Sequence, residues 1–398
     1  MLENIRILDI GRYVAGPYCA TLLGALGAEI IRVEKPNGGE DRYISPLNED
    51  AEQPELVMGG LFLQTACGKK SVSLNLAEAE GRDILKKLAA TADVIVANMP
   101  AKALEKLQLD WPQLQKLNPK AILVTQTAYG NTGPDKDKGG FDGVAQAQSG
   151  AMFLTGTPDQ PIKAGAPYVD YSTAVMSAFA TLAALMQRQQ TGRGQHVETT
   201  LLGTALSVMN AHLIEQAVTQ KNRVGTGNRV QTSAPSDVFK TQDGHVLIHT
   251  VGDGLFKRWA AMIGQPELAQ NPDYQGDQNR GDKRDELCAM MQQWCADKPT
   301  DEVLSALDAA GVPAGPVMNL QSALENPQVA AMSFFKDVPV PNMDKTAPVV
   351  GLPVTFSDYS PSELVPPPMI GAHTDEILEQ LDYNAEQINM LKEKGVVS

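Results

Sequence analysis

Asp170 is the residue of this chain whose type and position could do chemistry. It begins an apolar stretch with helical spacing, directly after the segment Gly165-Ala-Pro-Tyr-Val169. A carboxylate there can cap the helix by accepting a backbone N–H two or three residues later. It can also act as a nucleophile, because an aspartate with an ordinary pKa of about 3.9 is ionised at neutral pH and needs no general base. The local pattern leaves both roles open.

Small residues stand beside basic side chains in several loops next to predicted strands. Proteins bind phosphate groups through backbone N–H groups that have no other partner and through ammonium groups. Loops of this kind that converge on one sheet edge indicate a ligand with several phosphates. The loops contain Val14 to Pro17, Arg32 with Lys35 and Gly38-Gly39, Gly68 to Lys70, Asn98-Met99-Pro100 with Lys102 and Lys106, and Gly133 to Gly140 with Lys136 and Lys138.

Other common kinds of site lack their sequence patterns. There is no GxxxxGK[ST] loop and no strict GxGxxG after the first strand, which disfavours nucleotide hydrolysis and hydride transfer. The five histidines show neither HxxEH nor HExxH spacing, so we expect no metal site. A GxSxG nucleophile elbow is also missing, which leaves a Ser-His-Asp triad without support.

The first third of the chain alternates strand-like and helix-like segments. Short apolar runs at 5–10, 29–33, 71–74, 93–96 and 121–125 read as strands, with helical spacing at 18–26 and 78–90 between them. This βαβα pattern predicts a parallel sheet with helices on both faces, and ligands of such sheets lie at the carboxyl ends of the strands.

The later chain predicts two long helices and then a second domain. Tyr171 to Leu185 carries an apolar stripe that includes Val175 and Phe179, with Gly192 and Gly194 closing the helix, and a second helix covers 201–220. A hairpin-like run at 238–248 and short helices follow, and a last helix covers about 374–392. We therefore expect a large domain at 1–220, completed by about 330–398, and a small α+β domain at 237–320, with linkers at 221–236 and 321–340.

Composition indicates a soluble, cytoplasmic protein. The 398 residues are 43% hydrophobic and 20% charged, ordinary values for a globular chain. No secretory signal or membrane span is recognised, and the four cysteines lack CxxC spacing, so we expect reduced thiols. The net charge of −14 argues against nucleic acid or an anionic membrane as a partner, without excluding a small anionic ligand.

Motifs spread along the chain resemble the family III CoA-transferases, in family order from residue 8 to about 378. The first are Leu8-Asp-Ile-Gly-Arg-Tyr-Val-Ala-Gly-Pro-Tyr-Cys-Ala20 and Leu26-Gly-Ala-Glu-Ile-Ile-Arg-Val-Glu-Lys-Pro36. The others are Gly130-Asn-Thr-Gly-Pro134, Gly140-Phe-Asp142, Gln146-Ala-Gln-Ser-Gly150, Thr191-Gly-Arg-Gly-Gln195, Gly311-Val-Pro-Ala-Gly-Pro316 and Gly371-Ala-His-Thr-Asp-Glu-Ile-Leu378.

The resemblance implies an α/β fold, with a Rossmann-like large domain and a smaller α+β domain. It also implies a homodimer whose chains pass through each other like linked rings. The expected activity is CoA transfer between two carboxylic acids through aspartyl anhydride and aspartyl-CoA intermediates, with acyl-CoA as substrate and no permanently bound cofactor. The family nucleophile is an aspartate that opens a helix, and Asp170 stands at that position. Family CoA contacts carry over to Val14, Ala15, Lys35, Lys69, Asn98, Met99, Lys106, Lys138, Gly139, Gly140 and Phe141.

Departures from the family pattern bear on the substrate and the reaction. Oxalate-type transferases carry a glutamine where this chain has Val14, and their four-glycine loop is reduced to Gly225-Thr-Gly227, so oxalate fits less well. Racemases of the sister branch need a base, and the resemblance implies a histidine in the turn where this chain has Gly139-Gly140-Phe141-Asp142; Phe141 cannot transfer a proton. Either Gly139 and Gly140 or Gly225 and Gly227 are candidate oxyanion donors. A non-catalytic acyl-CoA-binding protein is the third alternative.

Overall fold

The computed structural model describes residues 1–47 and 58–398. The chain divides into two compact units, each formed by segments distant in sequence. The first unit comprises Met1–Ser149, Gly165–Val208 and Ala330–Ser398, and the second comprises Gly150–Ala164 and Met209–Val329.

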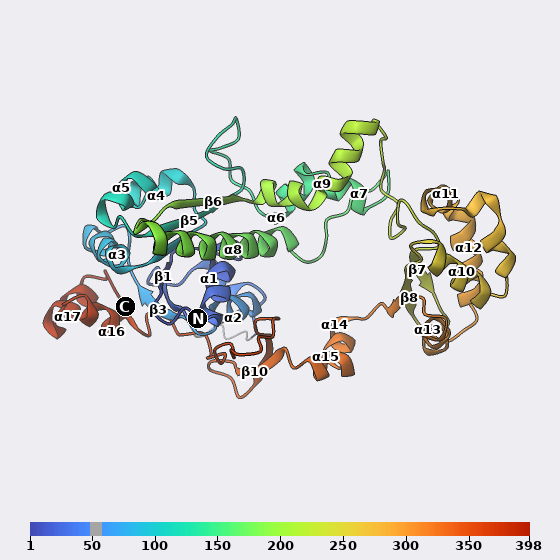
Figure 1. Ribbon diagram of the computed structural model, residues 1–398. Coiled ribbons are helices and arrows are strands. Elements are labelled where there is room, and N and C mark those ends of the chain that lie inside the picture. The colour runs from blue at the N-terminus through green and yellow to red at the C-terminus, as the bar shows by residue number, and fades with distance from the viewer. Residues whose placement is uncertain (48–57) are drawn as a thin grey trace. The chain divides into compact units, whose positions relative to one another are not determined.

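A six-stranded parallel sheet forms the centre of the first unit (Figure 1). Its order, β3-β2-β1-β4-β5-β6, is the 3-2-1-4-5-6 order of Rossmann-type sheets, whose ligands bind where the order reverses, between β1 and β4. The predicted α/β fold with a parallel sheet is thus confirmed. The strands are β1 (Arg6–Asp9), β2 (Glu29–Glu34), β3 (Lys70–Ser73), β4 (Val94–Ala97), β5 (Ile122–Thr127) and β6 (His196–Thr200).

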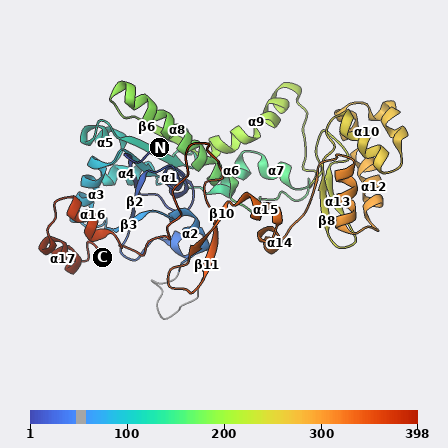
Figure 2. The same ribbon diagram turned by 60° about the horizontal axis from the view of Figure 1, so that its bottom comes forward.

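Successive residues of a strand point to opposite faces of the sheet. Apolar side chains therefore emerge on both faces of this sheet, and helices cover both. Ile7 packs in a core with residues of α1 and α8, whereas the next residue, Leu8, packs in a core with α3, α5, α16 and α17. Figure 2 shows the two C-terminal helices beside α3. The helices of this unit are α1 (Ala15–Ala25), α2 (Gly60–Ala66), α3 (Ala79–Thr91), α4 (Ala101–Leu107), α5 (Trp111–Leu117), α6 (Asp142–Gln148), α8 (Tyr168–Thr191), α16 (Thr374–Gln380) and α17 (Ala385–Glu393).

Helix α8 is long and apolar, and it ends where the sequence predicts. Gly192 adopts a φ of 68°, and its N–H donates to the Arg188 carbonyl oxygen at 2.8 Å. The expected apolar stripe is only partly core, because Val175 and Phe179 are 51% and 66% exposed. Among the described residues, α8 is the one helix with the length and composition to cross a membrane, and it is partly buried in the core on one face of the sheet.

Two sequence expectations need correction. The predicted single C-terminal helix is two helices, because Asp382 adopts a φ of 66° and Asn384 starts α17 with a capping box. The strand β6, which lies between the two long helices in the chain and pairs with β5, was not predicted. After α15 (Pro327–Met332), the proline-rich segment contains a hairpin of β10 (Phe335–Pro339) and β11 (Thr346–Val350).

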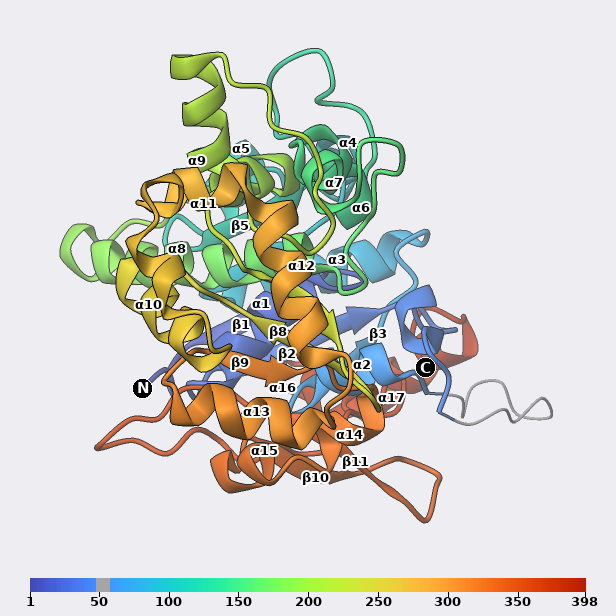
Figure 3. The same ribbon diagram turned by 90° about the vertical axis from the view of Figure 1, so that its right-hand side faces the viewer.

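The second unit has its own core around a three-stranded antiparallel sheet (Figure 3). Trp259 is fully buried in this core. The strands are β7 (Asp237–Lys240), β8 (His245–Ile248) and β9 (Ala314–Pro316). The helices are α7 (Ala151–Thr155), α10 (Asp253–Met262), α11 (Asp277–Asp282), α12 (Arg284–Cys295), α13 (Thr300–Ala309) and α14 (Leu320–Leu324), and α9 (Leu201–Thr219) runs through the boundary of the two units.

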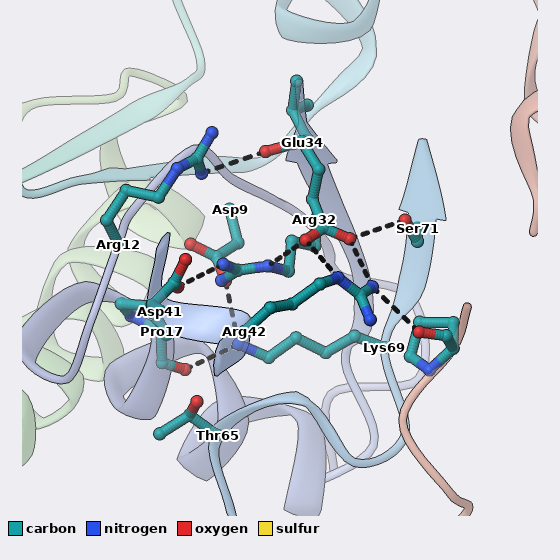
Figure 4. A network of polar contacts seen from close by, with 12 residues as sticks. Asp9, Arg12, Pro17, Arg32, Glu34, Asp41, Arg42, Thr65, Lys69 and Ser71 are labelled. Carbon is teal, nitrogen blue, oxygen red and sulfur yellow. Dashed lines mark hydrogen bonds and ion pairs between the residues drawn. The ribbon is translucent and has the colours of Figure 1, made fainter. Parts of the chain in front are cut away.

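A buried network of charges joins the first three strands of the parallel sheet (Figure 4). Lys69 Nζ donates to Asp9 Oδ2 at 2.8 Å and to the Pro17 carbonyl oxygen at 2.7 Å. Arg32 Nη2 contacts Asp41 Oδ2 at 2.5 Å and Arg32 Nη1 lies 3.5 Å from Asp9 Oδ2. Burial alone would raise the pKa of Asp9, but the charges of Lys69 and Arg32 outweigh it and hold that pKa below its ordinary value.

The same network ties the end of β2 to two later segments. Arg42 contacts both carboxylate oxygens of Glu34, at 3.0 and 2.7 Å, and donates to the Pro368 carbonyl oxygen at 2.9 Å. Ser71 Oγ donates to Glu34 Oε2 at 2.8 Å. The Phe62 ring lies 4.0 Å from the Arg42 guanidinium carbon, which adds a cation–π contact.

We predict that Lys69→Met destabilises the chain by about 3–5 kcal/mol, because it leaves the buried Asp9 carboxylate without its closest cation. Urea unfolding followed by circular dichroism measures the change. Lys394→Met is the control, since its ion pair with Glu80 at 3.1 Å is exposed and should contribute far less than the buried pair. Equal losses in the two variants would contradict the structural role of the buried pair.

Candidate active site

A cavity of about 540 Å³ opens at the carboxyl ends of β1, β4 and β5, at the point where the strand order reverses. Asp170, from the first turn of α8, lines this cavity. The remaining wall comes from the loops after those strands and from the turn before α6. Its residues are Ile10, Arg12 to Ala15, Asn98 to Pro100, Gln126 to Ala128, Lys136, Lys138 to Phe141, Val144 and Leu201.

Asp142 caps the helix that carries Asp170. Asp142 Oδ2 accepts the backbone N–H groups of Val169 at 2.8 Å and of Asp170 at 3.1 Å. The other oxygen, Oδ1, accepts a hydrogen bond from Gln146 Nε2. Asp170 itself is the third residue of α8, which has no side-chain cap bond from its own N-cap residue, Pro167. The helix-cap interpretation of Asp170 is therefore wrong, and its carboxyl group is free of that structural task.

The environment of Asp170 opposes ionisation of its carboxyl group. Burial raises its pKa, and the negative charge of Asp142 raises it further, to about 7. The sequence-based expectation of a fully ionised carboxylate at neutral pH is therefore corrected. A carboxylate of higher basicity is also a stronger nucleophile once it is ionised. The same environment therefore lowers the fraction of Asp170 that is ionised and raises the reactivity of that fraction.

The loop between β1 and α1 is fixed from several sides. Asn98 Oδ1 accepts the N–H of Arg12 at 2.7 Å, and Asn98 Nδ2 donates to the Arg12 carbonyl oxygen at 2.5 Å. Tyr13 adopts a φ of 63°, rare for a residue with a side chain, and its N–H donates to Asp41 Oδ2 at 3.2 Å. Its ring meets Phe141 edge to face at 5.5 Å. The Asp41 contact joins this strained loop to the buried charge network.

The structure brings most of the predicted site residues together. Asp170, Val14, Ala15, Asn98, Met99, Lys138, Gly139, Gly140 and Phe141 all line the same cavity. Phe141 is 64% exposed, and Lys138 makes an exposed ion pair with Asp135 at 2.6 Å. Of the alternative oxyanion donors, Gly227 already donates its N–H to the Gly156 carbonyl oxygen at 2.8 Å.

Three predicted lysines do not belong to the wall of this cavity. Lys69 is 4% exposed, and its ammonium group is taken up by Asp9 and Pro17. Lys35 pairs with Glu40 at 2.6 Å on the surface after β2, and Lys106 is an exposed residue in the last turn of α4. Lys35 and Lys106 stay predictions as contacts for distal parts of a ligand, whereas Lys69 has the surroundings of a structural residue.

The role of Asp142 could not be read from the sequence. Asp142 stands in the motif Gly140-Phe-Asp142, but its hydrogen bonds run to residues 27 and 28 positions away. No group of three metal-ligating side chains occurs among the residues at 1–47 and 58–398, so the described chain shows no metal centre.

We predict that Asp170→Asn stabilises the fold increasingly as pH rises through the acidic range. The folded chain keeps the Asp170 proton up to a pKa of about 7, whereas the unfolded chain releases it near 3.8. The unfolded state then binds fewer protons between these values, so the stability of the unaltered protein falls as pH rises from about 4 to about 7. Asparagine does not ionise, so the variant does not lose this stability as the pH rises.

The measurement is the difference in melting temperature between variant and unaltered protein across this pH range. The difference should grow up to about pH 7 and then level off. Asp159→Asn, which removes an exposed carboxylate outside the cavity, is the control. A pH-independent difference for Asp170→Asn would show that its carboxyl group does not titrate as described.

Comparison with known proteins shows the family of this chain. The family model described as CoA-transferase family III matches residues 2–374. The chain is 31% identical to succinyl-CoA:glutarate CoA-transferase of Homo sapiens over 399 residues, 100% of this chain and 90% of that protein. It is also 31% identical to succinyl-CoA–D-citramalate CoA-transferase of Chloroflexus aurantiacus over 404 residues, 100% of this chain and 98% of that one. A solved CaiB/BaiF family protein from Brucella suis superposes with a TM-score of 0.83 at 29% identity, covering 96% and 99% of the two chains. The chain therefore belongs to CoA-transferase family III.

Proposed function

We propose that this chain moves CoA from an acyl-CoA to a carboxylic acid, with Asp170 as the covalent nucleophile. The proposal rests on one observation, which is that Asp170 and most of the predicted CoA-contact residues line the same cavity. That cavity lies at the switch point of a Rossmann-type sheet, where ligands of such folds bind. The CoA-binding domain is the large domain at 1–220, completed by about 330–398.

The reaction begins with two displacements that load CoA onto the protein. An Asp170 carboxylate oxygen attacks the thioester carbonyl carbon, the C–S bond breaks, and CoA leaves as a thiolate with an aspartyl–acyl anhydride behind it. The thiolate then attacks the Asp170 carbonyl carbon of that anhydride. The C–O bond breaks, the first acid leaves as its carboxylate, and an aspartyl-CoA thioester remains.

Two further displacements deliver CoA to the acceptor. The acceptor carboxylate attacks the aspartyl carbonyl carbon and expels the thiolate, which forms a second anhydride. The thiolate attacks the acceptor's carbonyl carbon, releasing the new acyl-CoA and restoring the Asp170 carboxylate. No proton is transferred in any step, so the cavity needs no general base, only donors for the tetrahedral oxyanions. Gly139 and Gly140, which line the cavity, are the candidate donors.

We propose that basic side chains in and beyond the cavity wall bind the phosphates of CoA. Lys136 and Lys138 line the cavity, and we assign them to the phosphates together with Lys35 and Lys106. For the acids, the named relatives support succinyl-CoA as a donor and a second small carboxylic acid as acceptor. Four free and buried cysteines fit the reducing cytoplasm, where we place the protein.

The two alternatives have weaker support. A racemase needs a base for the α-proton, and the cavity wall contains Phe141 but no histidine among the described residues. A non-catalytic acyl-CoA-binding protein would have no use for a carboxyl group of raised pKa in the wall of the cavity.

We predict that Asp170→Asn lowers the transfer rate by more than about a thousandfold, because no other carboxylate lines the described cavity. CoA transfer from succinyl-CoA to glutarate, followed by mass spectrometry, measures the rate. The unaltered enzyme with succinyl-CoA alone should also carry CoA on Asp170, detected as a peptide adduct. Retained CoA affinity in the variant is the control for folding, and undiminished turnover would refute the nucleophile.

We also propose the homodimer of linked rings. An apolar groove of about 780 Å³, lined by Val175 and Met176 of α8 and Val208 of α9, lies open on the first unit. Phe179 beside it is 66% exposed. Only Leu201 and Ala205 are buried in the whole of α9, an unusual state for a helix of 19 largely apolar residues.

We predict a mass near twice 42.7 kDa by light scattering and no exchange of subunits between tagged and untagged protein under native conditions. Phe179→Glu should increase the monomer fraction, since it places a charge on the exposed apolar face. Leu117→Glu is the matched control, because Leu117 is 41% exposed on α5, away from this groove. A monomer in solution, or rapid exchange of subunits, would contradict the linked dimer.

A further inference from the structure

Arg12 is a cation of the cavity wall that the reaction described above does not use. It lies in the loop after β1, lines the same cavity as Asp170 and is half-buried. The two lysines of this wall, Lys136 and Lys138, are exposed, and Lys138 already pairs with Asp135. Among the described residues of the wall, Arg12 is therefore the one guanidinium and the one cation that is half-buried.

One nitrogen of the Arg12 guanidinium is held by the fold, and the other two are free. Nη1 donates to the carbonyl oxygens of Gly11 at 2.8 Å and of Val33 at 3.1 Å, which fixes the side chain between the loop after β1 and the end of β2. Nε and Nη2 have no hydrogen-bond partner in the described part of the chain. Neither belongs to its enclosed unpaired atoms, which include Nε and Nη1 of Arg32, so both nitrogens keep surface that solvent can reach. Gly39 contributes to this opening, because a Cβ there would lie 3.2 Å from Arg12 Nε.

The free edge of Arg12 has the geometry of a carboxylate site. Nε and one Nη of a guanidinium donate in parallel to the two oxygens of a single carboxylate. Arg42 in the same unit uses this edge, since its Nε and Nη2 contact the two oxygens of Glu34 at 3.0 and 2.7 Å. The same edge of Arg12 has no carboxylate partner among the described residues, so it is available to a carboxylate that a ligand brings.

The charges around Arg12 also favour an anion. Arg12 lies at the edge of the buried charge network, which contains three carboxylates that each have a cation of their own (Figure 4). The pairs are Asp9 with Lys69, Asp41 with Arg32, and Glu34 with Arg42. Arg12 is thus a fourth cation beside three carboxylates. Burial lowers the pKa of Arg12 and the charge of Arg32 lowers it further, so these carboxylates do not fully compensate its charge.

We propose that Arg12 is a specificity-determining residue that binds the second carboxylate of a dicarboxylic acyl group. This inference rests on the proposed CoA transfer through Asp170 and names the substrate class of that site. One carboxyl group of the acid reacts at Asp170, and the free edge of Arg12 holds the other. The exposed lysines are assigned to the phosphates of CoA, and Arg12 is the wall cation that remains for the acyl group. A monocarboxylic acid of the same length would leave this edge unpaired and is therefore a poorer substrate.

The first test compares three acceptors with the unaltered protein and succinyl-CoA. They are glutarate, glutaramate, in which an amide replaces the second carboxylate, and valerate, in which a methyl group replaces it. Glutarate should exceed both analogues in kcat/KM by about tenfold or more, because each analogue loses a bidentate charged pair. A value for glutarate no higher than those of the analogues overturns the inference, and a CoA adduct on Asp170 then still supports CoA transfer. Absence of both transfer and adduct refutes the proposed function, and the inference falls with it.

The second test assigns the preference to Arg12. Arg12→Met removes the guanidinium and should reduce the advantage of glutarate over glutaramate to within about threefold, with CoA affinity retained. Arg12→Gln replaces it if the methionine variant fails to fold. Arg82→Met is the matched control, because Arg82 is also half-buried and its Nη1 donates to two backbone carbonyl oxygens, those of Leu76 and Ala77, outside the cavity wall. The control should keep the full advantage of glutarate.

Two outcomes of the second test contradict the assignment. An unchanged advantage of glutarate in the Arg12 variants would show that another group holds the second carboxylate. An equal loss for all three acids would show that Arg12 does not distinguish them. Weaker binding of CoA in calorimetry, together with that equal loss, would place a phosphate of CoA at Arg12 instead.

Discussion

The buried charges around Asp9 are the constraint on which the rest of the first unit depends. Asp9 ends β1, yet it accepts from the Gly11 N–H at 2.9 Å and from Lys69, and it faces Arg32. Separating these groups would leave uncompensated charges in the protein interior, which costs several kcal/mol for each ion. The loop that follows β1 is thereby held in one conformation, including the strained Tyr13. Tyr13, which lines the cavity, is in this way tied to the buried ion pairs through Asp41.

Asp142 shows how this fold sets both the position and the basicity of Asp170. Its carboxylate satisfies two free N–H groups at the start of α8, a favourable place for a negative charge. The same charge raises the pKa of Asp170, whose burial has already raised it. Part of the stability gained at the cap is therefore offset by the cost of ionising Asp170. This balance leaves the Asp170 carboxyl group with a pKa of about 7.

The sequence predicted the parallel sheet and the position of Asp170, because strand periodicity and family motifs are local signals. It did not predict that Lys69 is buried, since its partner Asp9 lies 60 positions earlier in the chain. The strand β6 was missed because its residues are partly polar, and only its pairing with β5 defines it. Local patterns therefore reveal which residues are present, whereas long-range pairing decides which of them remain available to a ligand.

Side chains that remain exposed also indicate that the first unit alone does not shield the reaction fully from water. Anhydride intermediates react with water, so the proposed chemistry requires a cavity that excludes it. Phe141 at the cavity wall and Phe179 on α8 are 64% and 66% exposed, although apolar side chains of this size gain most when covered. Bound CoA can cover the first, and a second chain can cover the second. The two exposed aromatic rings therefore connect the chemistry of Asp170 with the proposed dimer. The chemistry and the dimer each require that water be removed from part of the surface of the first unit.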